Sequence, residues 1–106
     1  MKLLLGECLD WLLRQDLIGR EVRTVQAMGW NGIKNGRLLD QAQHEFQVFI
    51  TGDRNLFFQQ NVAKFSIAVV VLEAESIRLI HTQPLMPKVL AILPSLKPGQ
   101  IVNVAP

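Results

Sequence analysis

One run in the second half of the chain is almost entirely aliphatic and β-branched: Ser66-Ile67-Ala68-Val69-Val70-Val71-Leu72. It lacks the alternation of apolar and polar residues that a strand with one solvent-exposed face shows. A continuous apolar run of this length is typical of a strand that is buried on both faces, and such strands occur mainly in parallel sheets. The run therefore predicts a parallel sheet that is covered by helices on both sides.

Strand and helix patterns alternate along the rest of the chain. Further strand patterns cover residues 2–5, 21–25, 46–51 and 100–104, and helical patterns cover residues 9–17, 36–45 and 84–93. The first helical pattern has leucines at helical spacing, the second has Asn35 as a candidate N-cap, and the third has Pro84 near its first turn. A short helix is also predicted over residues 56–61, and an irregular connection over residues 73–83.

This alternation predicts an α/β protein with a three-layer α/β/α fold and a mostly parallel central sheet of about five strands. Because crossovers between parallel strands are right-handed, few strand orders remain, and 2-1-3-4-5 is the simplest of them. The chain has 106 residues, with no internal repeat and no linker-like stretch. We therefore expect a single domain over residues 1–106.

The composition excludes some classes of protein without choosing a function. Hydrophobic residues make up 49% of the chain and charged residues 19%, which excludes a disordered protein. The 11 basic and 9 acidic residues leave a net charge of +2, too small to indicate a nucleic-acid binder by charge alone. The single cysteine, Cys8, excludes an internal disulfide and a zinc site built from several cysteines.

No targeting or membrane segment stands out in the sequence. The apolar run of residues 3–5 is too short for the apolar region of a signal peptide. No apolar run approaches the ~20 residues that a membrane-spanning helix needs. We therefore expect a cytoplasmic protein that does not enter the membrane.

The predicted strand order points to one place for a ligand. In open parallel sheets, ligands bind beyond the carboxyl ends of the strands where the strand order reverses, here between the first and third strands. Glu7 follows the first of these strands and Asp53 follows the other. Two carboxylates in one crevice could hold a hard cation such as Mg²⁺, which polarises a phosphoryl group or activates a water molecule. The alternative is structural, with Glu7 favoured at the start of a helix and Asp53 capping a turn.

Other polar residues give weaker signals. His44 and His81 are far apart in the sequence and have no metal-ligand spacing. Ser66 and Ser95 have no base near them in the sequence that would indicate a catalytic triad. The glycine-rich loop of residues 29–36 lacks the lysine followed by Ser or Thr that a phosphate-binding loop carries, so a nucleotide-binding α/β domain is only a third interpretation.

Several short segments match a known family in their order and spacing. They are Met1-Lys2-Leu3-Leu4-Leu5, Glu7-Cys8, Glu21-Val22-Arg23-Thr24-Val25, Met28-Gly29-Trp30, Lys34-Asn35-Gly36, Leu38-Leu39, Val48-Phe49-Ile50-Thr51, Asp53-Arg54-Asn55-Leu56, Ile67-Ala68-Val69-Val70-Val71-Leu72 and Leu96-Lys97-Pro98-Gly99. Over nearly its whole length the chain resembles the short PIN-like domains, a branch of the PIN ribonuclease superfamily that includes VapC-type toxins.

The resemblance implies an α/β/α fold, a Mg²⁺- or Mn²⁺-dependent ribonuclease site and a small antitoxin protein as partner. In such a site, Glu7 and Asp53 would be the catalytic and metal-binding residues. Arg54 and Arg37 would bind the phosphates of the RNA. The surplus of aliphatic residues is also compatible with a homodimer.

Two positions depart from the family pattern. The first strand of the family typically ends in Asp-Glu, whereas this chain has Gly6 before Glu7. The family usually has Glu after the Asn-Gly that opens the middle helix, where this chain has Arg37. The site is therefore short of carboxylates for a divalent ion, and Arg37 could take the place of the cation by pairing with Glu7 or Asp53. We expect a PIN-like protein with a degenerate nuclease site; the alternative is a non-catalytic module that binds an antitoxin or RNA.

Overall fold

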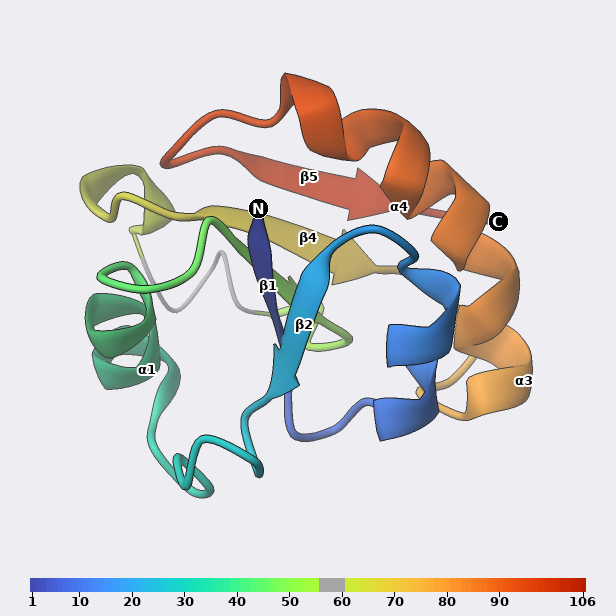
Figure 1. Cartoon of the computed structure of the whole chain (residues 1–106), viewed down its shortest axis with the longest axis horizontal. Coiled ribbons are helices and arrows are strands. Elements are labelled where there is room, and N and C mark those ends of the chain that lie inside the picture. Colours follow the sequence, from blue (N-terminus) through green and yellow to red (C-terminus); the bar gives the residue numbers. More distant parts are fainter. Residues whose placement is uncertain (56–60) are drawn as a thin grey trace.

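The computed structural model of the chain, which describes residues 1–55 and 61–106, is built around one parallel sheet. Its five strands follow the order β2-β1-β3-β4-β5 (Figure 1). They are β1 (Lys2–Leu5), β2 (Glu21–Thr24), β3 (Val48–Thr51), β4 (Ala68–Leu72) and β5 (Ile101–Val104). The predicted α/β class, the parallel sheet and the order 2-1-3-4-5 are all confirmed.

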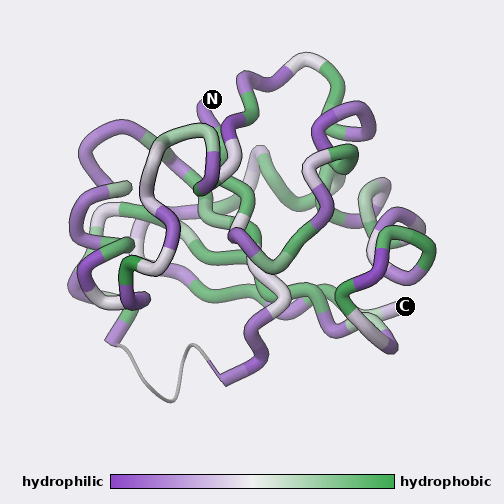
Figure 2. The backbone as a smooth tube through the Cα atoms, turned by 90° about the horizontal axis from the view of Figure 1, so that it is seen from below, coloured by the Kyte–Doolittle hydropathy of each residue, from purple (hydrophilic) through white to green (hydrophobic). Residues whose placement is uncertain are grey.

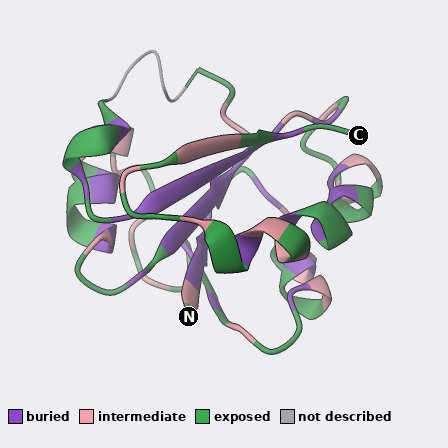
Figure 3. Ribbon diagram, turned by 90° about the horizontal axis from the view of Figure 1, so that it is seen from above, coloured by how far each residue is buried: buried purple, intermediate pink, exposed green. Residues whose placement is uncertain are grey.

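Helical segments cover both faces of the sheet (Figures 1 and 3). Among the described residues the α-helices are α1 (Asn35–Ala42), α3 (Leu79–Thr82) and α4 (Met86–Ile92). The same residues include the 3₁₀ segments η1 (Trp11–Asp16), η2 (Val62–Lys64), η3 (Gln83–Leu85) and η4 (Leu93–Ser95). Helix α1 lies on one side of the sheet, and η1, α3 and α4 lie on the other. The arrangement is compatible with a three-layer α/β/α fold.

The strands divide their side chains between two cores because successive residues of a strand point to opposite faces. In β1, Leu3 and Leu5 belong to the core beneath η1 and α4, while Leu4 belongs to the core beneath α1. Strand β4 is buried at every position, as the aliphatic run predicts, and Figure 3 shows the central strands as buried while the edge strand β5 is more exposed. In Figure 2 the same strands are the hydrophobic centre of the molecule, and hydrophilic residues gather in the outer turns.

The first predicted helix is shorter and tighter than expected. Residues 11–16 take 3₁₀ geometry, which is common in short connecting segments. The Asp10 side chain caps the segment by accepting a hydrogen bond from the backbone N–H of Leu12 at 2.9 Å. Leu13 and Leu17 are buried in the core, so the predicted apolar face is present although the helix type differs.

Two other helix predictions need correction. Helix α1 begins one residue early and ends at Ala42 rather than at residue 45, and residues 43–45 form a turn in which the Glu45 backbone N–H donates to the Ala42 carbonyl at 3.0 Å. Asn35 is the first residue of α1 and makes no capping bond. Residues 73–83, predicted as irregular, contain α3. The short helix predicted over residues 56–61 lies outside the described residues, apart from Asn61.

The third predicted helix is interrupted by its prolines. Segments η3, α4 and η4 follow one another from Gln83 to Ser95, and each has a proline at its first or second position. Proline suits a first turn but lacks the N–H that continues a helix, so the chain changes helix type at each one. In the part of the chain that the structure describes, no helix has the length and apolar character needed to cross a membrane.

Candidate functional site at the carboxyl end of the sheet

The carboxyl ends of β1 and β3 meet side by side, as the strand order requires. Gly6, the first residue after β1, donates a backbone hydrogen bond to the Ile50 carbonyl at 2.8 Å. A Cβ atom built on Gly6 would lie 3.4 Å from the Thr51 hydroxyl oxygen and 3.4 Å from the Ile50 carbonyl oxygen, an ordinary contact distance. Position 6 therefore has room for a side chain, which would lie beside the end of β3.

Asp53 is held in place by neutral hydrogen-bond donors. Its backbone N–H donates to the Thr51 hydroxyl at 3.0 Å. One carboxylate oxygen accepts from the backbone N–H of Asn55 at 3.0 Å, and the other accepts from the side-chain amide of Asn35 at 3.1 Å. The predicted turn-capping role is present, and the contact with Asn35 is additional.

Glu7 is connected to the loop between β2 and α1. Its carboxylate accepts a hydrogen bond from the backbone N–H of Gly32 at 3.2 Å, and its backbone carbonyl accepts from the Gln26 side-chain amide at 2.9 Å. Gly32 has a φ of 78°, a conformation that favours glycine. The same loop ends at Asn35, which contacts Asp53. The loop thus bridges the two predicted carboxylates and does more than turn the chain.

The side chains of Asn35 and Arg37, both in α1, have different surroundings. Asn35 contacts Asp53, whereas Arg37 is exposed and lies in a shallow hollow with Asp40, Gln43 and Lys64. Among the described residues Arg37 makes no ion pair with Glu7 or Asp53. The Arg37 guanidinium therefore does not take the place of a metal cation beside these carboxylates. The sequence assigned Asn35 to a helix cap, and nothing in one sequence distinguishes a capping Asn from one that reaches across a loop.

Arg54 reaches the loop that follows β4. Its guanidinium donates a hydrogen bond to the Ala74 carbonyl. Arg54 lines a cavity of about 120 Å³ with Gly52, Ser76 and Ile77. Its guanidinium therefore lies at the same end of the sheet as Asp53, on the side of β4, where it could contact an anionic ligand.

The residues present do not form a fitted site for Mg²⁺ or Mn²⁺. Both carboxylate oxygens of Asp53 and one of Glu7 already accept hydrogen bonds from neutral donors. Position 6 supplies no carboxylate, and the described residues include no group of three or more His, Cys, Asp or Glu side chains placed to hold a metal ion. Hard divalent ions are bound by several oxygen ligands, so this donor set is sparse.

The structure also reveals a polar cluster that the sequence did not suggest. The Ser76 hydroxyl lies 2.6 Å from Nδ1 of His81, and Nε2 of His81 lies 3.3 Å from the Glu75 carboxylate. The Ser76 hydroxyl oxygen also accepts from the backbone N–H of Arg78 at 3.1 Å, which is a local turn contact. Ser76 and His81 are five residues apart, on either side of the start of α3. This spacing is the feature of the sequence that could have indicated their contact.

Comparisons of the chain with protein-family models, with curated proteins and with solved structures find no match. The site is therefore interpreted from its own geometry.

Proposed function

We propose that this chain is a PIN-like RNA-binding protein of toxin–antitoxin type whose metal-dependent nuclease site is degenerate. The observation that carries the proposal is the shortage of carboxylates where β1 and β3 end. Glycine occupies position 6 beside Thr51, and an amide, that of Asn35, faces Asp53. Position 6 has room for a Cβ atom, and an Asp at position 35 would face Asp53, so two substitutions would add carboxylates where a divalent ion could be bound.

The remaining groups suit the binding of RNA more than its hydrolysis. Arg54, at the carboxyl end of the sheet, and Arg37, in the hollow between α1 and Lys64, are the proposed phosphate contacts. Glu7 and Asp53 are the proposed remnants of the catalytic and metal-binding set. We expect them to bind Mg²⁺ or Mn²⁺ weakly, and we derive no hydrolytic step through such an ion.

Restoring the carboxylates tests the proposal directly. The variant Gly6→Asp/Asn35→Asp should cleave a single-stranded RNA in the presence of Mn²⁺, while the natural chain should bind the same RNA and leave it intact. Gly6→Ala/Gln41→Glu is a control, since it fills position 6 with a methyl group and adds one of the two charges on the exposed face of α1, away from Asp53. Cleavage by the natural chain that Asp53→Ala abolishes would show an active enzyme and contradict the proposal.

The same variants separate degeneration from a purely binding role in cells. Growth arrest of bacteria that express only the restored variant favours a degenerate toxin. Absence of arrest with either form favours the second candidate, a non-catalytic PIN-like module that holds an antitoxin or RNA. The observation in favour of this second candidate is that the carboxylate oxygens of Asp53 are already taken up by Asn35 and Asn55. We place both forms in the cytoplasm, where the small antitoxin and the RNA would be found.

A further inference from the structure

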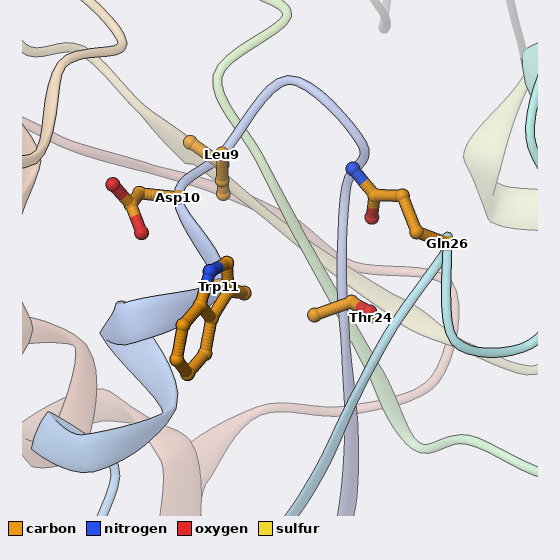
Figure 4. Close-up of a pocket in the computed structure, with 5 residues that line it drawn as sticks. All are labelled: Leu9, Asp10, Trp11, Thr24 and Gln26. Atoms are coloured by element: carbon orange, nitrogen blue, oxygen red, sulfur yellow. The ribbon is translucent and has the colours of Figure 1, made fainter.

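A second hollow lies beside Glu7, on the β2 side of β1. Its volume is about 400 Å³, within the range of small-molecule sites, and it lies at the carboxyl ends of β1 and β2. Its lining residues are Leu9, Asp10, Trp11, Thr24 and Gln26 (Figure 4). Strand β1 lies between β2 and β3. The hollow is therefore on the β2 side of β1, and Asp53 is on the β3 side.

Trp11 forms one wall of the hollow and is free to stack on a ligand. Its side chain is 53% exposed, and the Arg14 guanidinium lies 5.4 Å from the centre of its ring. The other tryptophan, Trp30, is half-buried and packs edge-on against Phe46 with ring centroids 6.0 Å apart. The indole of Trp11 therefore offers a flat surface next to a cation, a combination that stacks nucleobases and attracts phosphate.

Gln26 supplies the polar group opposite Trp11. Figure 4 shows Trp11 on one side of the hollow and Thr24 and Gln26 on the other, with the Asp10 carboxylate turned away from them. One N–H of the Gln26 amide donates to the Glu7 carbonyl at 2.9 Å, which fixes the orientation of the amide. A primary amide has a second N–H donor and a carbonyl acceptor, and within the described chain these two groups of Gln26 have no partner.

The geometry points to a subsite for an unpaired adenine base of RNA in this hollow. A glutamine amide recognises adenine through a pair of hydrogen bonds, accepting from the N6 amine and donating to N7. An exposed tryptophan supplies the stacking that single-stranded RNA recognition uses. The bond from Gln26 to the Glu7 backbone joins this hollow to the candidate site. The inference rests on the proposed function only in taking RNA as the ligand.

Tryptophan fluorescence tests the subsite without any assay of hydrolysis. The full chain carrying Trp30→Phe has Trp11 as its single tryptophan emitter. Hexa-adenylate RNA should quench this emission saturably, and hexa-uridylate RNA should do so with an affinity at least about fivefold weaker. Binding of fluorescein-labelled hexa-adenylate to the natural chain, followed by anisotropy, gives a second measurement that does not depend on the Trp30→Phe change.

Two substitutions divide the stacking from the recognition of the base. Trp11→Ala should weaken hexa-adenylate binding about 5- to 150-fold, and Trp11→Phe should recover most of it. Gln26→Leu should remove the preference for adenine and leave hexa-uridylate binding almost unchanged. Ile18→Ala and Gln41→Leu are the matched controls, since both residues are exposed and lie outside the hollow, and both should bind like the natural chain.

The outcomes separate this inference from the proposed function. Equal affinity for the two RNAs overturns the assignment of adenine, and unchanged binding by Trp11→Ala, or no quenching by either RNA, overturns the subsite altogether. If Trp11-dependent binding is found but Gly6→Asp/Asn35→Asp cleaves no RNA, the subsite stands and the degenerate-nuclease proposal fails. If that variant cleaves RNA and Trp11→Ala binds RNA like the natural chain, the degenerate-nuclease proposal stands and the subsite is overturned.

Discussion

The charged side chains at the two ends of the central sheet have different kinds of partners. At the amino end, Lys2 lies 3.6 Å from the carboxylates of both Glu21 and Glu45, and Glu21 also lies 3.5 Å from Arg23. At the carboxyl end, Glu7 and Asp53 accept hydrogen bonds from backbone N–H groups and an amide, and they make no ion pair with a described residue. Opposite charges pair at the first end, whereas the carboxylates of Glu7 and Asp53 at the second end have no charged partner among the described residues.

This difference indicates where a ligand can act. Paired charges at the amino end satisfy one another, so that end has little to offer a charged ligand. At the carboxyl end, neutral donors fix the carboxylates without cancelling their charge, and the guanidinium of Arg54 is held by a backbone carbonyl. Ligands of open parallel sheets bind at this end. The comparison predicts that substitutions at the amino end change stability alone, whereas those at the carboxyl end also change binding.

The largest expected effect comes from the core that both ends share. Leu5, the last residue of β1, is fully buried in the core beneath η1 and α4, and Leu5→Ala should lower the free energy of unfolding by about 2–5 kcal/mol because it leaves a cavity in a packed core. Urea unfolding measures this change. Val102→Ala, at a half-buried position of the edge strand β5, is the control and should cost clearly less. Equal losses for the two variants would mean that the core is not packed as described.

The second effect is the loss of the hydrogen bonds to Asp53. Asp53→Ala removes the acceptors for Asn35 and for the backbone of Asn55, and should destabilise the chain by about 1–2 kcal/mol. It should also strengthen RNA binding, because it removes a negative charge beside the proposed phosphate contact Arg54. Asp16→Ala removes an exposed contact with the Gln83 side chain and should leave both stability and RNA binding near those of the natural chain. Equal effects of the two substitutions on stability and on RNA binding would mean that Asp53 is not part of a binding site at the carboxyl end.

The smallest effect is expected at the amino end. Lys2→Met removes two ion pairs between partly exposed groups and should cost about 0.2–1 kcal/mol, with no change in RNA binding. Because salt screens such pairs, the difference between Lys2→Met and the natural chain should shrink as salt is raised in thermal unfolding. Glu7→Gln, which keeps an acceptor oxygen for Gly32, should show no such salt dependence. A salt-independent loss for Lys2→Met would mean that the contact of the Lys2 ammonium with the Phe46 ring, 5.4 Å from its centre, matters more than the ion pairs.

The fold was largely predictable because hydrophobic periodicity and chain connectivity constrain it. The aliphatic run of β4 implied a parallel sheet, and the alternation of elements with right-handed crossovers left 2-1-3-4-5 as the simplest order. The helix details were less predictable, because tertiary contacts decide them. The type of the η1 segment and the start of α1 depend on Asp10 and Asn35, whose short polar side chains can cap, turn or reach across a loop.

The site was predictable only as a location. The positions of Glu7 and Asp53 at the carboxyl end follow from the strand order, but their partners do not. Gly32, Gln26 and Asn35 reach them through the loop between β2 and α1, whose path depends on packing that the sequence pattern does not encode. For the same reason the Ser76–His81 contact and the hollow beside Trp11 became visible only in three dimensions.

The central claim, an intact α/β scaffold around a metal site that lacks carboxylates, is tested most directly by calorimetric titration with Mn²⁺. The natural chain should bind the ion weakly, and Gly6→Asp/Asn35→Asp should bind it at least about tenfold more tightly, a difference of about 1.4 kcal/mol. Gly6→Ala/Gln41→Glu should bind like the natural chain. Tight binding by the natural chain, with no gain in the restored variant, would contradict the account.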